Sequence, residues 1–189
     1  MNELIHYLLQ FGHLNQQQIE LIQSKFHQKE IEKDTYYQKA GQIPNEFIFI
    51  TEGVMRVCYY DHNGDEITKA FVDEHKLVAD IVNYNIGSPS TEYIQAITHC
   101  KYLTISKSAM EDLSQTVITW DAIIAKIISK GLTQKVNIFS RMMAEDATER
   151  YQKFLIHFPN IVNRIPLSYV ASFLGMTQSS LSRIRKNIS

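Results

Sequence analysis

The chain has 189 residues, of which 44% are hydrophobic and 21% are charged, and its formal net charge is −1. This is the composition of a soluble globular protein, and the length suits one large or two modest domains. No apolar run reaches the roughly 18 residues that a membrane-spanning helix needs, and the N-terminus lacks a basic start followed by a continuous apolar segment, so we expect a cytoplasmic protein with no membrane partner.

The first predicted element is a short helix at residues 15–26. Ile19, Ile22 and Phe26 recur at helical spacing, and Asn15 is a suitable N-cap because its side chain can accept a hydrogen bond from the first turn. A helix is therefore expected to begin the body of the protein.

Residues 30–106 contain short runs rich in Ile, Val, Phe, Tyr and Thr, separated by turn residues. Many short strands with turns between them predict a β-sandwich or barrel. The clearest hairpin joins residues 54–60 to residues 66–72, because Asn63 and Gly64 tolerate the positive φ angles of a tight turn.

The two cysteines, Cys58 and Cys100, lie in strand-like segments far apart in the sequence. Their position predicts buried thiols. An iron–sulfur cluster needs about four thiolates, so this kind of sensing is excluded for a single chain. The histidines show no zinc-like spacing, and we expect no metal site and no cofactor.

A long amphipathic helix is predicted at residues 117–143. Apolar residues recur every three or four positions, among them Ile124, Leu132, Val136 and Phe139. About 27 residues give a helix of roughly 40 Å at 1.5 Å per residue. It could simply pack along its own barrel, but so wide a stripe favours a parallel partner helix in a homodimer. A break at 144–146, which contains the acidic residues Glu145 and Asp146, then precedes another helix at 147–157.

The last predicted feature is a helix-turn-helix at residues 167–186. Small Ala171 lies where two helices would cross, and Gly175 lies where the chain must turn. Buried positions are expected at Val170, Leu174, Leu181 and Ile184. The same pattern fits two plain amphipathic helices joined by a turn, but the outward edge of the second helix is polar and basic, as the major groove of DNA requires.

The charge is unevenly distributed along the chain. Residues 150–189 contain six Lys or Arg and no Asp or Glu, whereas residues 1–149 contain thirteen basic and twenty acidic residues. A basic end on an acidic body restricts favourable contact with a polyanion to that end. The pattern therefore favours a DNA-binding protein.

The predicted order of elements is a helix, a jelly-roll-like barrel, a long helix and a helix-turn-helix. This organisation resembles that of the Crp/Fnr family of bacterial transcription regulators, most closely its short Bacteroidetes-like members. The resemblance covers essentially the whole chain and depends on residues 47–57, 147–155 and 169–185. It implies an α+β fold with three parts: a cyclic-nucleotide-binding-like sensor barrel with its N-terminal helix at 1–116, a dimerisation helix at 117–143 and a DNA-binding domain at 144–189.

The same resemblance implies which residues would contact DNA. Gln178, Ser179 and Arg183 are expected to read base edges, with Arg183 contacting guanine. Residues that would contact or approach phosphates are Thr177, Ser180, Ser182, Arg185 and Lys186. The family usually adds a β-hairpin wing after this helix, where only residues 187–189 follow here, so fewer phosphate contacts are expected.

The chain departs from the family at the effector site. Members that bind cyclic nucleotide use a Gly-Glu pair for the ribose and an Arg-Ser pair for the phosphate, but this chain has Ala79-Asp80 and Ser90-Thr91 there. Ser90 has no charge to offset a buried phosphate, so we expect no response to cyclic AMP. Lys135 and Val136 fall where such members place a Thr-Ser pair against the adenine, so another anion, or nothing, would occupy the cavity.

The sequence thus predicts a homodimeric regulator that binds a palindromic operator in double-stranded DNA, with RNA polymerase as a further partner if it activates transcription. No phosphate loop or nucleophile elbow is present, so catalytic residues and an enzyme function are not expected. The alternative is a ligand-binding or protein-interaction module that keeps the barrel but has lost effective operator binding.

Overall fold

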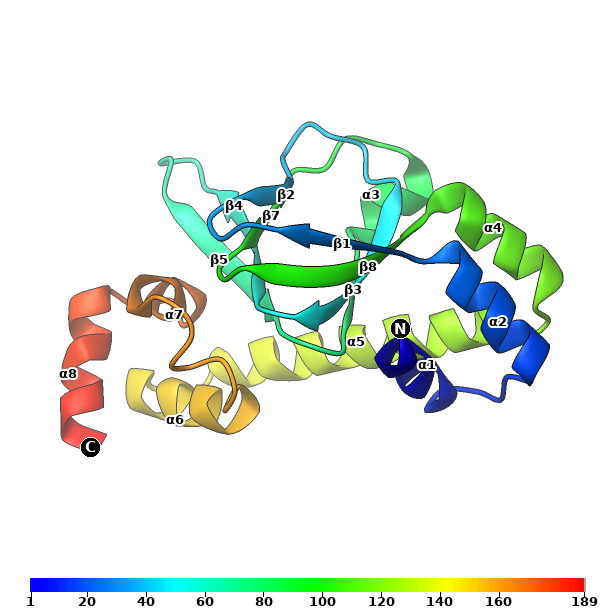
Figure 1. Ribbon diagram of the computed structural model, residues 1–189. Coiled ribbons are helices and arrows are strands. Elements are labelled where there is room, and N and C mark those ends of the chain that lie inside the picture. Colours follow the sequence, from blue (N-terminus) through cyan, green and yellow to red (C-terminus); the bar gives the residue numbers. More distant parts are fainter. Residues whose placement is uncertain (189) are drawn as a thin grey trace.

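The computed structural model describes residues 1–188 and shows a β-barrel of two four-stranded antiparallel sheets with helices at both ends (Figure 1). In spatial order, the first sheet contains β1 (His27–Ile31), β8 (Cys100–Ser106), β3 (Glu46–Glu52) and β6 (Leu77–Val78). The second contains β2 (Tyr36–Gln38), β7 (Tyr93–Ala96), β4 (Met55–Tyr60) and β5 (Glu66–Val72). The predicted α+β jelly-roll fold is confirmed.

The predicted hairpin is β4 joined to β5, in the register that pairs Tyr60 with Glu66. Gly64 has φ +84° in the turn, as the tight connection requires. The barrel interior is apolar because inward-facing residues such as Ile48, Met55 and Ile94 are buried between the two sheets. Cys58 and Cys100 are free and buried, as expected.

Two helices precede the barrel. The predicted one is α2 (Gln16–Lys25), which begins with a capping box between Asn15 and Gln18. The other, α1 (Asn2–Leu9), was not predicted, although Leu4, Ile5 and Leu8 have helical spacing and are buried against the barrel. A further short helix, α3 (Ile81–Ile86), interrupts the strands between β6 and β7.

Gly53 joins β3 to β4 in a conformation that suits only glycine. Its φ is +102°, and a Cβ there would lie 2.5 Å from the His99 carbonyl oxygen and 2.6 Å from Cys100 Sγ. Gly53→Ala should destabilise the barrel by about 2 kcal/mol or more, measured by urea unfolding. Gly41→Ala is the matched control, because Gly41 also has a positive φ but nothing within 4 Å of its Cβ position. Equal losses in the two variants would contradict the steric account.

The long helix is α5 (Trp120–Met142), which follows α4 (Lys107–Thr116). The prediction that it begins at Val117 is wrong, because the Val117 amide donates to Leu113 O and closes α4 instead. The first half of α5 packs on the barrel through Trp120, Ile123 and Ile127. Within residues 1–188 no helix combines the length and the apolar character needed to cross a membrane.

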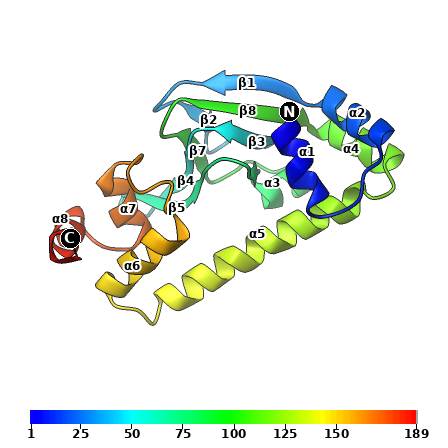
Figure 2. The ribbon, with the colours of Figure 1, turned by 60° about the horizontal axis from the view of Figure 1, so that its bottom comes forward.

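Three helices follow α5 and gather at the end of the molecule opposite α1 (Figure 2). The break at 144–146 and the helix α6 (Ala147–His157) are as predicted, and a capping box between Asp146 and Glu149 begins α6. The predicted helix-turn-helix consists of α7 (Leu167–Phe173) and α8 (Gln178–Ile188). These helices share their own apolar core, which includes Phe154, Ile161 and Leu181.

Candidate nucleic-acid interface

The turn between α7 and α8 is built by Ala171, Gly175 and Arg150. Ala171 is buried, and its carbonyl accepts a hydrogen bond from Met176 N at 3.0 Å. Gly175 takes the left-handed conformation that ends many helices, with φ +65°. Arg150 Nη1 donates to the Leu174 carbonyl at 2.6 Å, so Arg150 holds the end of α7.

α8 is fixed on one side and open on the other. Leu181 is fully buried, and Ile184 is half-buried against the core of helices α6 to α8. The exposed residues of the expected DNA-binding set are Thr177, Gln178, Ser179, Arg183, Arg185 and Lys186, whereas Ser180 and Ser182 are half-buried. The helix thus presents one polar, basic face to solvent.

Thr177 has a structural role besides its expected approach to phosphate. Its Oγ1 accepts a hydrogen bond from Ser180 N at 3.2 Å and so caps the first turn of α8. The amide groups of that turn lie at the positive end of the helix dipole, which favours an anion such as a phosphate.

At least three of the six basic residues in the C-terminal segment have partners inside the protein. Arg150 contacts the α7–α8 turn, Lys153 is paired with Glu145, and Arg164 is paired with Glu74 of the barrel. The hydrogen bond of Arg150 goes to a backbone carbonyl and not to a carboxylate. The exposed positive charge of this segment is therefore concentrated on α8, where Arg183, Arg185 and Lys186 lie.

The second half of α5 exposes apolar side chains. Leu132, Val136, Phe139 and Met143 are 61%, 56%, 40% and 90% exposed. Spaced three or four residues apart, they share one face of the helix. Such a stripe is unusual on a monomer's surface and is suited to burial against a second helix.

Two of the residues expected at an effector site, Asp80 and Ser90, are in contact between α3 and β7. Asp80 caps α3, and its Oδ2 accepts hydrogen bonds from Ser90 Oγ at 2.6 Å and Asn83 Nδ2 at 2.7 Å. Ala79 and Asp80 are half-buried, Ser90 is buried and Thr91 is exposed. Partial burial alone would raise the pKa of Asp80, but these hydrogen bonds lower it, so the carboxyl stays ionised.

Lys135 of α5 interacts electrostatically with charged groups at this position, including Asp80. Desolvation of its ammonium and repulsion from Lys69 lower the pKa of Lys135, while Glu92 and Asp80 favour its charged form. Lys69 itself forms an ion pair with Glu92. Val136, by contrast, belongs to the exposed stripe of α5. Two carboxylates and two ammonium groups therefore interact at the position that, by the resemblance described above, would correspond to the cyclic phosphate of cyclic-nucleotide-binding regulators.

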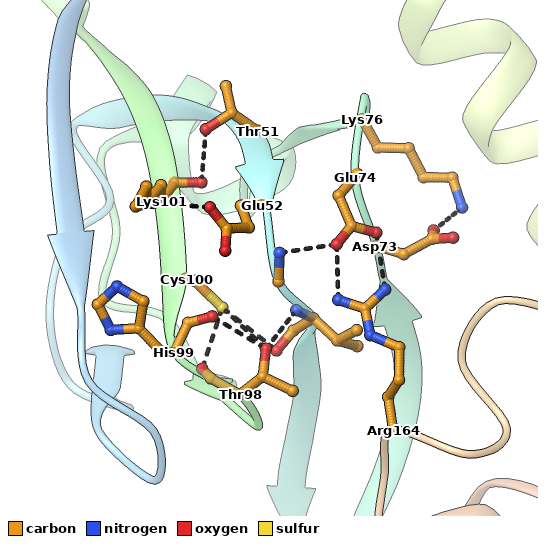
Figure 3. A network of polar contacts seen from close by, with 12 residues as sticks. Thr51, Glu52, Asp73, Glu74, Lys76, Thr98, His99, Cys100, Lys101 and Arg164 are labelled. Carbon is orange, nitrogen blue, oxygen red and sulfur yellow. Dashed lines mark hydrogen bonds and ion pairs between the residues drawn. The ribbon is translucent and has the colours of Figure 1, made fainter.

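The segment between α6 and α7 is attached to the barrel by an ion pair (Figure 3). Arg164 Nη1 and Nη2 donate to the two oxygens of Glu74 at 3.0 and 2.6 Å, and Gly53 N donates to Glu74 Oε1 at 2.7 Å. Burial alone would raise the pKa of Glu74, but these hydrogen bonds lower it to about 2. The bidentate arrangement is the strong form of such a pair.

This ion pair predicts a specific pH dependence. Because the folded-state pKa of Glu74 is depressed, its contribution is present above the unfolded-state value of about 4.3 and is lost as the pH falls through about 2. Between about pH 5 and 2, the unfolding free energy of the wild type should therefore decrease more than that of Glu74→Gln. The difference should be about 1–2 kcal/mol, allowing for partial solvent screening. Urea unfolding across this range measures it. An exposed-site control, Glu111→Gln, should keep the wild-type slope, and an unchanged slope in Glu74→Gln would refute the account.

Comparisons with known proteins agree with this architecture. Residues 28–117 match the family described as the cyclic nucleotide-binding domain. The comparison with curated proteins gives no match. Similar solved structures include the c-di-GMP-responsive global regulator CLP of Xanthomonas campestris, with 17% identity, 92% of this chain and 91% of that chain covered, and a TM-score of 0.73.

Two further structures are similar over most of their length. FixK2 from Bradyrhizobium japonicum has 14% identity, with 86% of this chain and 84% of that chain covered and a TM-score of 0.76. A transcriptional regulator of the Crp/Fnr family from Eubacterium rectale has 15% identity, with 92% and 83% covered and a TM-score of 0.70. These likenesses establish the fold.

Proposed function

We propose that this chain, which has the fold of the Crp/Fnr regulators, binds an operator in double-stranded DNA as a homodimer. The observation that supports this most is α8, a helix held by a buried core on one side and presenting Gln178, Ser179 and Arg183 on the other. A guanidinium on such a face can make the bidentate contact to guanine, and Gln178 can pair with adenine. Arg185 and Lys186 supply charge for phosphates.

The homodimer forms along α5. The exposed stripe that begins at Leu132 packs against the same stripe of a second chain, which is the self-complementary contact of a two-fold axis. Two copies of α8 then read the two halves of a palindrome, with centres about 34 Å apart, one turn of DNA.

Cyclic AMP is not the effector of this regulator. A cyclic phosphate at the usual position would lie beside the ionised Asp80 carboxylate, and Ser90, which already donates to that carboxylate, offers no compensating charge. The nearby ammonium groups are already engaged, because Lys69 is paired with Glu92 and Lys135 faces Asp80 and Glu92. A phosphate that is not neutralised by a cation is strongly unfavourable in a buried position. Added cyclic AMP should leave both the melting temperature and DNA binding unchanged.

The test is an equilibrium titration of promoter fragments, including the DNA upstream of the protein's own gene, at two salt concentrations. Sequence-selective binding that weakens as salt increases supports the proposal. Weak binding with no preference among fragments would contradict it and would favour the ligand-binding or protein-interaction module instead.

A further inference from the structure

We propose that Arg56 of the barrel is a positioning residue that holds the helix-turn-helix in one orientation, so that α8 is presented to DNA in a fixed direction. The inference rests on the proposed function, because it concerns how the DNA-reading helix is oriented. The evidence for it is a continuous contact between the outer face of the β4–β5 hairpin and α7.

Arg56 is a buried cation, and hydrogen bonds to residues of the barrel strands fix the plane of its guanidinium group. It is 1% exposed. Its Nε and Nη2 donate to Gln95 Oε1 at 2.9 and 2.7 Å, and Nη2 also donates to Glu66 Oε1 at 2.6 Å. Nη1 donates to Thr68 Oγ1 at 3.3 Å. These bonds lie around the edge of the guanidinium and leave its flat face to contact another group.

That face is covered by the helix-turn-helix. Arg56 Cζ lies 3.6 Å from the centre of the Tyr169 ring on α7. A desolvated guanidinium stacked on an aromatic ring is attracted by the ring's quadrupole, and the contact depends strongly on orientation. Tyr169 therefore fixes α7 against a group that the strands have already immobilised.

A second polar contact lies one turn further along α7. Ser172 Oγ accepts a hydrogen bond from Thr68 N at 2.9 Å and donates to Glu66 O at 3.2 Å. β5 is an edge strand, so these backbone groups have no neighbouring strand on that side. Ser172 forms a hydrogen bond with each of these two backbone groups and so fixes the position of α7 along β5.

Apolar packing and an ion pair complete the contact. Phe71 of β5 packs against Phe173 of α7 and Phe154 of α6, with ring centres 5.4 and 6.0 Å apart. Beyond this aromatic group, Glu74 holds Arg164. The helix-turn-helix is therefore held at several points on the barrel and not only by the short connection from α5.

The docked arrangement leaves the reading face open. Gln178 and Arg183 are exposed while α7 is in contact with β5, and α8 lies on the side of α7 that faces away from the barrel (Figure 1). Docking therefore restricts the orientation of α8 without covering it. Loosening the contact would give α8 orientational freedom that DNA binding must remove, and affinity would fall.

The experiment combines hydrogen exchange with operator binding for three variants. Tyr169→Leu should increase exchange at the Thr68 amide about tenfold and weaken operator binding about tenfold, without changing exchange in the β3–β8 pairing or the dimer mass. Tyr169→Phe retains the ring and should behave as wild type. Tyr59→Leu makes the same change at an exposed position of β4 and should also have no effect.

Two results would overturn the inference. One is unchanged exchange at Thr68 in Tyr169→Leu, which would mean that the stacked pair does not hold α7. The other is increased exchange with unchanged operator affinity, which would mean that docking does not position α8. If the wild-type protein selects no operator at all, the proposed function fails, and the exchange measurement by itself still reports whether Tyr169 holds α7 on the barrel.

Discussion

Replacing Arg183 with alanine is expected to weaken operator binding by about 1–3 kcal/mol, or about 5- to 150-fold, and to relax the preference at one base pair in each half-site. The reason is geometric, because Arg183 is exposed on a helix whose opposite side is fixed by buried Leu181. A bidentate contact to guanine depends on that fixed presentation. Titration of the operator and of single-base variants measures both effects.

Lys186→Ala is the matched control for Arg183→Ala, since both remove one exposed cation from α8. Loss of a phosphate contact should weaken all sequences alike and reduce the slope of log affinity against log salt by about one. If Arg183→Ala instead behaves like Lys186→Ala, with sequence preference intact, Arg183 does not read a base.

Introducing glutamate at both Leu132 and Val136 should convert the dimer into a monomer and abolish tight operator binding. These residues are 61% and 56% exposed in the single chain and lie on one face of α5. Across a two-fold axis each new carboxylate would be buried near its own copy, which is strongly unfavourable. A monomer binds only one half-site, so it loses the additional affinity that comes from linking two DNA-binding helices in one dimer.

Sedimentation and native mass spectrometry give the subunit number, and the operator titration gives the affinity. Ile43→Glu is the control, because Ile43 is a similarly exposed apolar residue in the β2–β3 connection, outside α5. It should remain dimeric. A doubly substituted Leu132 and Val136 protein that still sediments as a dimer would show that α5 is not the interface.

The elements specified by local patterns were predictable. The capping boxes at Asn15 and Asp146 identify helix starts from residues three apart, and Asn63-Gly64 identifies the β4–β5 turn in the same way. The spacing of Leu174 and Leu181 around Gly175 was enough to locate the helix-turn-helix. Each of these depends on neighbours within about one or two turns of the chain.

Contacts between distant segments were not predictable. Arg164 and Glu74 are 90 residues apart, and Thr68 and Ser172 are 104 apart, so no local spacing indicates either pair. Arg56 reads as an ordinary strand residue in the sequence, and its burial becomes visible only when α7 covers it. The start of α5 was misplaced for a related reason, because the competing hydrogen bond that ends α4 leaves no clear sequence signal.

The effector position was predictable in residue type but not in arrangement. The absence of an arginine beside Ser90 follows from the sequence, and it argues against a cyclic phosphate. The hydrogen bond between Ser90 and Asp80, and the approach of Lys135 from α5, depend on the folded barrel. A spacing argument alone could not reveal that the position contains internally paired charges.

Selection of binding sites from random duplex DNA by the wild-type protein tests the central claim most directly. If α8 reads base edges from each chain, the enriched sequences will share a palindrome whose half-sites are centred about one helical turn apart, and they will lose enrichment with Arg183→Ala. A folded, dimeric protein that enriches no common sequence would contradict the claim.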